Sequence, residues 1–340
     1  MKKTAYFFII TISIVFILVV GKTILIPFVF ALLLWFIVRS IREFLNKISF
    51  VNRFFPLWLK NLIPSVFLLG IFLLISRMLM VNINTLTKSY SSYEGNVQVL
   101  ITQLNDFFDI NMLEYVKSGS VDFNFLNLLQ KIVESLTGLV SNAFIIILYA
   151  SFILLEETYF ISKLKIIFSR ESHFRQLSKV MREIDTSVTK YMGLKTFVSI
   201  ITGTASYLAL YFIGVDAPLF WAFLIFLLNF IPTIGSLIAT LFPVFFCLLQ
   251  FGDFTKGFLV LGIVGGIQVL VGNILEPRLA GNTLNISPFV AIFALSIWGA
   301  IWGITGMFLS VPITVIMVII FSHFPSTKAI SIMLSEKGRI

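Results

Sequence analysis

The chain has 340 residues, of which 58% are hydrophobic and only 12% are charged. A soluble domain carries roughly 25% charged residues, so most of this surface is expected to avoid water. The net charge of +9 would suggest nucleic-acid binding in a soluble protein, but here the basic residues lie in short loops between apolar runs, where membrane topology explains them better. The composition therefore argues against a nucleic-acid partner and predicts a protein of the lipid bilayer.

Long apolar runs predict an all-α polytopic integral membrane protein. Barrel strands would alternate apolar and polar residues, whereas these runs are continuously apolar. One cysteine and two distant histidines show no metal-ligand spacing, so we expect no metal. The sequence also shows no phosphate-binding glycine loop, no serine–histidine pair with useful spacing and no two-carboxylate hydrolase signal, so we expect no cofactor and no enzyme activity. About eight segments approach or exceed the roughly 20 residues that span a bilayer; they lie at about 5–20, 23–38, 62–81, 138–155, 196–213, 218–250, 257–272 and 288–320.

Residues 1–81 are interpreted as N-terminal transmembrane helices. Two lysines follow Met1 and precede an apolar run, as in a secretory signal, but no small-residue cleavage site follows. The loop at 39–60 carries five basic residues and one acid, which favours the cytoplasmic side of the membrane.

Two polar segments flank a transmembrane helix at 138–155, and both are predicted to be amphipathic helices. Acids outnumber bases in 82–137, which places it outside the cell. Bases outnumber acids in 156–195, which places it in the cytoplasm, together with both termini and the 328–340 tail. In the second segment an apolar seam predicts either packing on the membrane or the helix bundle, or an oligomer contact; it consists of Phe174, Leu177, Met181, Ile184, Val188 and Tyr191.

Residues 196–327 are interpreted as the transport core, because they contain only five charged residues. Two apolar segments within it are longer than a crossing requires: 219–249 would form a straight helix of about 46 Å against a hydrocarbon core of about 30 Å, and 288–320 is longer still. Residues that interrupt helices lie near the middle of both segments: Asn229, Pro232, Thr233 and Gly235 in the first, and Gly299, Gly303 and Gly306 in the second.

Each long segment is therefore predicted to break within a few residues of Pro232 and of Gly303. A break frees backbone carbonyl and amide groups at membrane depth, and a pair of broken segments is the best sequence indication of a transporter binding site. The alternative is two kinked spanning helices whose glycines only allow close packing. Loop charges do not distinguish kinked helices from re-entrant hairpins.

The helix between the two broken segments carries a stripe of glycines, which allows helices to approach closely. Gln268 and Asn273 belong to this helical segment and could offer amide groups to a solute. Glu276 continues the same face, and an acid near hydrocarbon is costly unless it is paired or functional. Pro277 is expected to end the helix. Two hypotheses stay open: Glu276 binds a coupling ion, or Arg278 neutralises it in a structural salt bridge.

Four motifs follow one another along the chain: Thr23-Ile-Leu-Ile-Pro27 through Ala31; Phe230-Ile-Pro-Thr-Ile-Gly235 with Pro243 downstream; Gly272-Asn273 through Glu276-Pro277-Arg278 with Gly281 and Pro288; and Gly303-Ile-Thr-Gly306 before Val311-Pro312. In this order and spacing they resemble the bacterial autoinducer-2 exporter family over nearly the whole chain, except 82–137. The resemblance implies a homo-oligomeric secondary transporter of the bacterial inner membrane, and it alone suggests a pentamer. It also implies autoinducer-2 export or sodium(lithium)/proton antiport.

The leading hypothesis is an exporter of a small polar solute. The sequence carries no Walker-type phosphate loop for ATP, so uphill export would have to be driven by an ion gradient. The alternatives are a sodium(lithium)/proton antiporter, in which Glu276 is the shared ligand of the cation and the proton, and a non-transporting oligomeric scaffold or passive pore. A hydroxyl-rich solute would need amide, hydroxyl and freed backbone groups. The candidate binding residues are Asn229, Pro232, Thr233, Gly235, Gln268, Asn273, Glu276, Arg278, Gly303 and Gly306.

Overall fold

The computed structural model describes residues 2–46, 48, 53, 55–108, 125–168, 171–280, 286–336 and 338. Every regular element among them is a helix, which confirms the all-α prediction. In chain order the helices are α1 (Lys2–Val20), α2 (Lys22–Asn46), α4 (Leu57–Phe108), α6 (Phe125–Ile167), α7 (Glu171–Ile213), α8 (Pro218–Leu228), α9 (Ile234–Phe251), α10 (Phe254–Val269), the π-helical η1 (Leu270–Leu275), α11 (Glu276–Ala280), α12 (Pro288–His323) and α13 (Lys328–Leu334).

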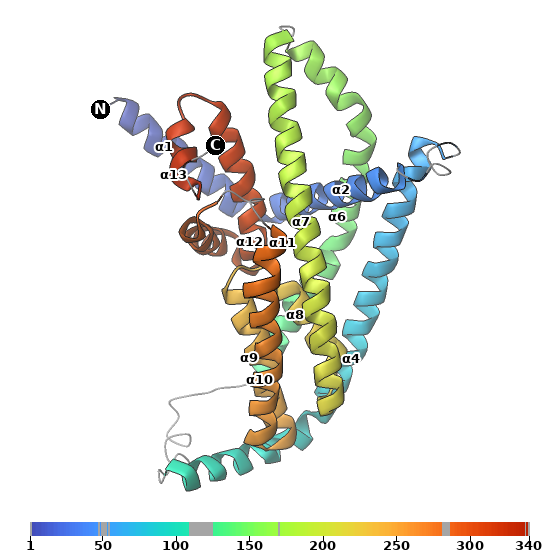
Figure 1. The fold of residues 1–340 in the computed structure, drawn as a ribbon, viewed down its shortest axis with the longest axis vertical. Helices are drawn as coiled ribbons and strands as arrows, with labels where there is room; N and C mark the ends of the chain where they lie inside the picture. Colours follow the sequence, from blue (N-terminus) through green and yellow to red (C-terminus); the bar gives the residue numbers. More distant parts are fainter. Residues whose placement is uncertain are drawn as a thin grey trace. The chain divides into compact units, whose positions relative to one another are not determined.

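Three helices are much longer than a membrane is thick (Figure 1). Measured along the helix axis, the 52 residues of α4 amount to about 78 Å of helix and the 43 residues each of α6 and α7 to about 64 Å, against a hydrocarbon core of about 30 Å. The described parts of 82–137 and 156–195 are therefore continuations of the neighbouring long helices, while 109–124 lies outside the described residues.

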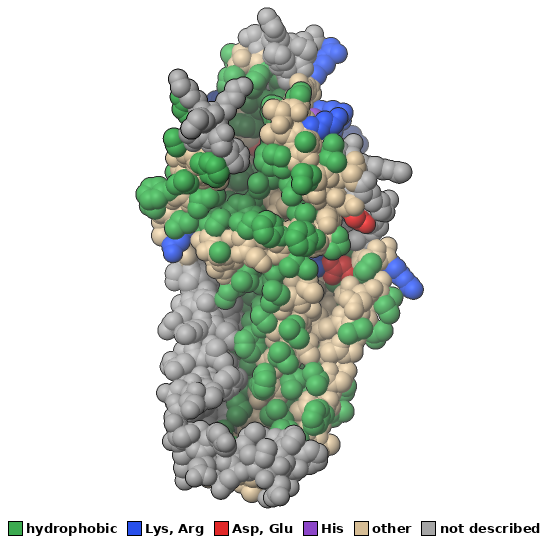
Figure 2. All heavy atoms as spheres, turned by 90° about the vertical axis from the view of Figure 1, so that its left-hand side faces the viewer, with side chains coloured by type: hydrophobic (Ala, Val, Ile, Leu, Met, Phe, Trp, Pro, Cys, Tyr) green, Lys and Arg blue, Asp and Glu red, His purple; other side chains and the backbone are tan. Residues whose placement is uncertain are grey.

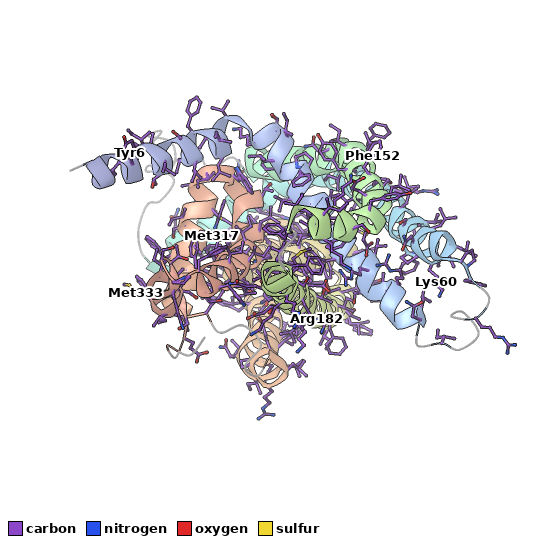
Figure 3. The ribbon with its side chains drawn as sticks, turned by 90° about the horizontal axis from the view of Figure 1, so that it is seen from above. Tyr6, Lys60, Phe152, Arg182, Met317 and Met333 are labelled. Atoms are coloured by element: carbon purple, nitrogen blue, oxygen red, sulfur yellow. The ribbon has the colours of Figure 1, made fainter. Side chains whose placement is uncertain are left out.

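The apolar surface fits a multi-pass membrane protein. Large hydrophobic side chains that would be buried in a soluble protein are exposed, including Tyr6 on α1 (63%), Phe152 on α6 (61%) and Met333 on α13 (81%), which Figure 3 labels. Figure 2 shows hydrophobic side chains across the described part of one face and few charged ones. Among the described residues, five helices are long and apolar enough to cross a membrane: Lys22–Arg42, Phe174–Ile213, Ile234–Phe251, Phe254–Leu279 and Pro288–His323.

The chain forms two compact units, each built from separate stretches. Unit 1 comprises Met1–Gly70, Ser141–Leu194 and Ala280–Ile340. In it Ala31 of α2 packs with Ile146 and Ala150 of α6. The seam predicted along 174–191 is buried at Val188 (0% exposed) and Tyr191 (2%), so its C-terminal end packs inside the protein.

Unit 2 comprises Ile71–Val140 and Lys195–Leu279. Its apolar core joins the short helix α8 to α9 and α10, with Phe220, Trp221, Cys247 and Val260 fully buried or nearly so. Helices α9 and α10 lie side by side (Figure 1), and their long contact runs antiparallel.

The first long segment is broken where Pro232 predicted. Helix α8 ends at Leu228 and α9 starts at Ile234. Between them Thr233 has φ 59° and ψ −59°, and the Ile234 N–H donates to the Pro232 carbonyl at 2.6 Å. This is a γ-turn of the rare, strained kind, and a β-branched residue at positive φ adds to the strain.

The two arms of this segment fold back on each other. The rings of Trp221 in α8 and Phe246 in α9 lie 4.9 Å apart. At the open end the Gln250 side chain accepts from the Asp216 N–H at 2.7 Å and donates to the Gly214 carbonyl at 2.9 Å. Residues 218–250 are therefore a helical hairpin, and the alternative of one kinked spanning helix is wrong for this segment.

The second long segment is broken at Gly303, also as predicted. Gly303 has φ 63° and ψ −144° inside α12, a conformation that favours glycine. The bend brings the Met307 side chain against Gly299, and a Cβ on Gly306 would lie 1.8 Å from the Trp298 carbonyl oxygen.

The expectation that Pro277 ends its helix is wrong. Helix α10 widens into the π-helix η1, in which the Glu276 N–H donates to Val271, five residues back, and α11 continues through Pro277. At the change from π to α register the hydrogen-bond ladder is already offset, so the missing proline N–H is tolerated.

Candidate functional site

An ion pair that the sequence did not predict lies in unit 2. Glu276 Oε1 is 2.5 Å from Lys195 Nζ, and the two side chains are only 22% and 9% exposed. Arg278 is exposed instead. The hypothesis that Arg278 neutralises Glu276 is therefore replaced by a partner 81 positions away in the sequence.

Lys195 reaches the break because α7 packs antiparallel on α8. The two helices touch at Gly203, where a Cβ would lie 3.2 Å from the Ala222 carbonyl oxygen. One turn further back along α7, toward the break, Asn229 Nδ2 donates to Ser199 Oγ at 3.1 Å. Lys195 precedes Ser199 by one further turn, so its side chain extends beyond the C-terminal end of α8.

Glu276 reaches the same place because α10 packs antiparallel on α9. Gly257 lies against the Leu248 side chain, and Gly265 lies against Thr240. Six residues back from Thr240 lies Ile234, where α9 starts, and six residues on from Gly265 lies Val271. Glu276 follows Val271 by about one turn, so it lies just beyond the start of α9. The carboxylate therefore arrives at the level of the broken segment.

The Lys195 ammonium also holds the broken backbone. It donates to the Asn229 carbonyl oxygen at 3.3 Å. Asn229 is the C-cap of α8, and the last carbonyls of a helix lack partners within the helix and carry partial negative charge. One cation thus satisfies both an intramembrane acid and a carbonyl that the break has freed.

The other predicted residues of unit 2 differ in their surroundings. Gln268 is 6% exposed, and its Nε2 has no hydrogen-bond partner in the described part of the chain. Asn273 and the Thr233 side chain are exposed, and Pro232 forms the turn. Gly235 has a steric role, since a Cβ there would lie 1.9 Å from the Leu228 carbonyl oxygen. The structure therefore brings Asn229 and Glu276 together through their shared partner, Lys195.

The remaining two predicted residues, Gly303 and Gly306, belong to unit 1 and form its break. Their backbone conformation and close packing explain why glycine is needed there.

Sequence reasoning missed Lys195 because it stands at the boundary between the basic segment 156–195 and the apolar segment 196–213. A signal was present: Ser199, Thr202 and Ser206 continue its face at helical spacing and are all 0% exposed. The Thr202 hydroxyl donates to the Val198 carbonyl of its own helix, and Ser206 Oγ has no hydrogen-bond partner among the described residues. A lysine at the head of a buried polar face is a candidate for a buried role.

Unit 1 contains a second charge cluster. Arg42 Nη1 and Nη2 donate to the two Glu157 carboxylate oxygens at 3.1 and 2.6 Å. The Trp35 indole N–H donates to Glu157 Oε2 at 3.1 Å, and Arg42 Nη1 also donates to Asn61 Oδ1 at 2.8 Å. The cluster ties α2, α4 and α6 together.

The cluster that includes Arg42 and Trp35 changes the pKa of the Glu157 carboxyl. Glu157 lies two residues beyond the apolar stretch 138–155. Burial raises the pKa of Glu157, but the hydrogen bonds from Arg42 and Trp35 and the charges of Arg42 and Arg39 outweigh burial, so the pKa is lowered overall. Glu157 is therefore held as a carboxylate.

Comparison with known proteins places the chain in a family. Residues 7–326 match the family described as AI-2E family transporter. A "Putative transport protein" of Haemophilus influenzae is 28% identical over 323 residues, covering 92% of this chain and 90% of that protein. The "AI-2 transport protein TqsA" of Escherichia coli is 31% identical over 265 residues, covering 76% and 75%. Another "Putative transport protein", from Borreliella burgdorferi, is 37% identical over 202 residues, 59% of this chain and 56% of its own length. The chain belongs to the AI-2E family of membrane transporters.

Proposed function

We propose that the protein is a secondary transporter that exports a small polar solute of the autoinducer-2 kind across the bacterial inner membrane, driven by an ion gradient. The observation that carries the proposal is the Lys195–Glu276 pair at the broken segment α8–α9. An intramembrane acid and lysine are costly and mark ion or solute pathways in membrane proteins. The name of the TqsA relative supports the solute class.

The chemistry around the break suits a solute with several hydroxyl groups. Such a solute needs hydrogen-bond donors and acceptors that are already desolvated. Gln268, on α10 about two turns before Glu276, offers an amide whose Nε2 has no partner among the described residues. The strained turn at Thr233 supplies backbone that a solute could rearrange, since strain of this kind is often found at binding sites.

A second candidate function is sodium(lithium)/proton antiport, and one observation favours it. The Glu276 carboxylate and the Asn229 carbonyl already surround a monovalent cation, the Lys195 ammonium, with oxygen atoms. Oxygen ligands of this kind suit hard metal cations. In this function Glu276 would bind the cation and the proton alternately.

Flux through purified protein in liposomes tests the proposal. Autoinducer-2 or lithium would be supplied on one side, with and without an imposed proton gradient. Gradient-dependent solute flux supports the exporter, and lithium flux coupled to proton counterflow supports the antiporter. Flux that ignores the gradient would indicate a passive pore, and no flux of either substrate would contradict the proposal.

We also propose that both termini are cytoplasmic, that the end of α4 is extracytoplasmic and that the protein is a homo-oligomer. The loop charges and the family resemblance support these points. Single cysteines at the exposed positions Thr102 and Lys179, in a chain in which Cys247 is replaced by serine, would test the orientation. We expect an impermeant reagent to label position 102 from outside and position 179 only after permeabilisation. The mass of the purified protein in detergent tests the oligomer.

A further inference from the structure

We propose that Lys195 is a tethered occupant of the coupling-ion site: its ammonium takes the place of a free monovalent cation between Glu276 and the Asn229 carbonyl, and it withdraws when a cation binds or a proton neutralises the acid. The inference rests on the proposed gradient coupling, and it identifies the ligands of the ion and the device that keeps the empty site neutral.

The first argument is the set of partners around the ammonium. Lys195 is 7% exposed, and two of its contacts are oxygen atoms from different elements, one a carboxylate and one a main-chain carbonyl. If the lysine side chain leaves, a buried carboxylate and the negative end of α8 remain facing the same volume. That volume then attracts a small monovalent cation.

The second argument is that the lysine is able to leave. Its ammonium lies closest to Oε1 of Glu276 and carries a compact charge without a fixed two-pronged geometry, and its stem is a flexible chain of four carbons. A free cation and the ammonium cannot both neutralise one carboxylate without repelling each other. Binding of the ion therefore drives the lysine out, and protonation of Glu276 removes the attraction that holds it.

The third argument is that the elements carrying both ligands are ready to move. Glu276 directly follows the π-helix η1, and π-helical turns are frequently found at functional sites. Conversion of η1 to α-helical register would turn Glu276 about the helix axis by roughly 100° and away from α7. On the other side, Asn229 adjoins the strained turn at Thr233. Loss of the Lys195 contacts therefore frees both sides of the break.

Cation-dependent thermal stability tests the inference without any transport. Wild type, Lys195→Ala and Lys195→Ala/Glu276→Gln would be melted in detergent with lithium, sodium, potassium or choline chloride at equal ionic strength. We expect Lys195→Ala to be stabilised by about 3 °C or more in at least one alkali cation relative to choline, because a ligand that binds only the folded state raises Tm. We expect a smaller shift in wild type, where the ammonium competes, and none in the double variant.

The result that overturns the inference is a Lys195→Ala protein that no alkali cation stabilises beyond choline. If this variant does not fold, Lys195→Gln is used in the same way. Lys195→Arg is the matched control, because it keeps the tethered charge and should remain insensitive to the cation. Selective stabilisation without flux in liposomes would sustain the site and refute the transport proposal, so the two failures can be told apart.

Discussion

In each unit a buried basic side chain, Arg42 or Lys195, pairs with an acid, and the two pairs are built differently. In unit 1 the Arg42 guanidinium meets both oxygens of Glu157, with Trp35 and Asn61 completing the hydrogen bonds. In unit 2 the Lys195 ammonium lies against Oε1 of Glu276 and also donates to the Asn229 backbone carbonyl. A bidentate guanidinium pair with further hydrogen bonds is fixed in geometry, whereas a compact ammonium on a flexible stem can be exchanged. The comparison therefore suggests a structural role for the Arg42–Glu157 pair and an exchangeable role for the Lys195–Glu276 pair.

The two broken segments differ as well. In unit 2 the break is a separate turn containing Pro232 and the strained Thr233. In unit 1 it is a bend at Gly303 within α12, and the adjacent Trp302 indole N–H donates to the Leu18 carbonyl of α1 at 2.9 Å. Unit 1 thus anchors its bend to a neighbouring helix.

The largest effect is expected at the two glycines that each pack against a backbone carbonyl oxygen at a break. Alanine at Gly235 or at Gly306 would place a Cβ less than 2 Å from a carbonyl oxygen, which the backbone can relieve only by opening the bend. We expect neither variant to be recovered as a folded, monodisperse protein in size-exclusion chromatography. Gly262→Ala is the control, because no atom lies within 4 Å of its added Cβ. Wild-type behaviour of Gly235→Ala would refute the close contact at the first break.

The next effect tests whether Glu276 couples transport to the ion gradient. We expect Glu276→Gln to reduce gradient-driven flux in liposomes to background while the protein stays folded, because the amide cannot exchange a proton or balance a cation. Arg278→Gln should keep wild-type flux, since Glu276 pairs with Lys195 instead. Asp253→Asn should change little, because asparagine also caps α10 in place of the Asp253 carboxylate. Full flux in Glu276→Gln would remove its coupling role.

A smaller effect is expected on stability in unit 1. Arg42→Ala leaves the Glu157 carboxylate without its main partner, and breaking a buried pair of this kind costs about 3 kcal/mol. The midpoint of denaturant unfolding in detergent would measure it. We expect Arg42→Lys to recover only part of the loss, because lysine lacks the two-pronged donor. Equal stability of Arg42→Lys and wild type would show that the bidentate geometry adds nothing.

The smallest effect is a dependence of stability on pH. The pKa of Glu157 is lowered from its ordinary value of 4.5. Burial alone would raise it, but the hydrogen bonds from Arg42 and Trp35 and the charges of Arg42 and Arg39 outweigh burial. A lowered pKa stabilises the fold above the ordinary value, and this contribution is lost as pH falls through 4.5 toward the folded value. We expect Tm to fall more steeply below this pH in wild type than in Glu157→Gln. Parallel profiles would mean that Glu157 is not held ionised by its partners.

Much of the architecture followed from local features of the sequence. Segments too long for one crossing, with Pro232 and Gly303 near their middles, predicted both breaks, because proline and glycine act on the backbone within a few residues. The partner of Glu276 was not predictable in this way. Arg278 is nearer in sequence, but at a spacing of two residues on a helix it does not face the same side.

The sequence by itself determined that this protein is a helical membrane protein, where its long apolar segments break, and that an acid follows the glycine-lined helix between the two broken segments. These properties depend on composition, periodicity and single residues. Only the tertiary structure decided that Lys195 neutralises this acid and caps α8, and that 218–250 turns back as a hairpin. Those outcomes depend on the antiparallel registers of α7 with α8 and α9 with α10, which packing at Gly203, Gly257 and Gly265 sets between residues far apart in the chain.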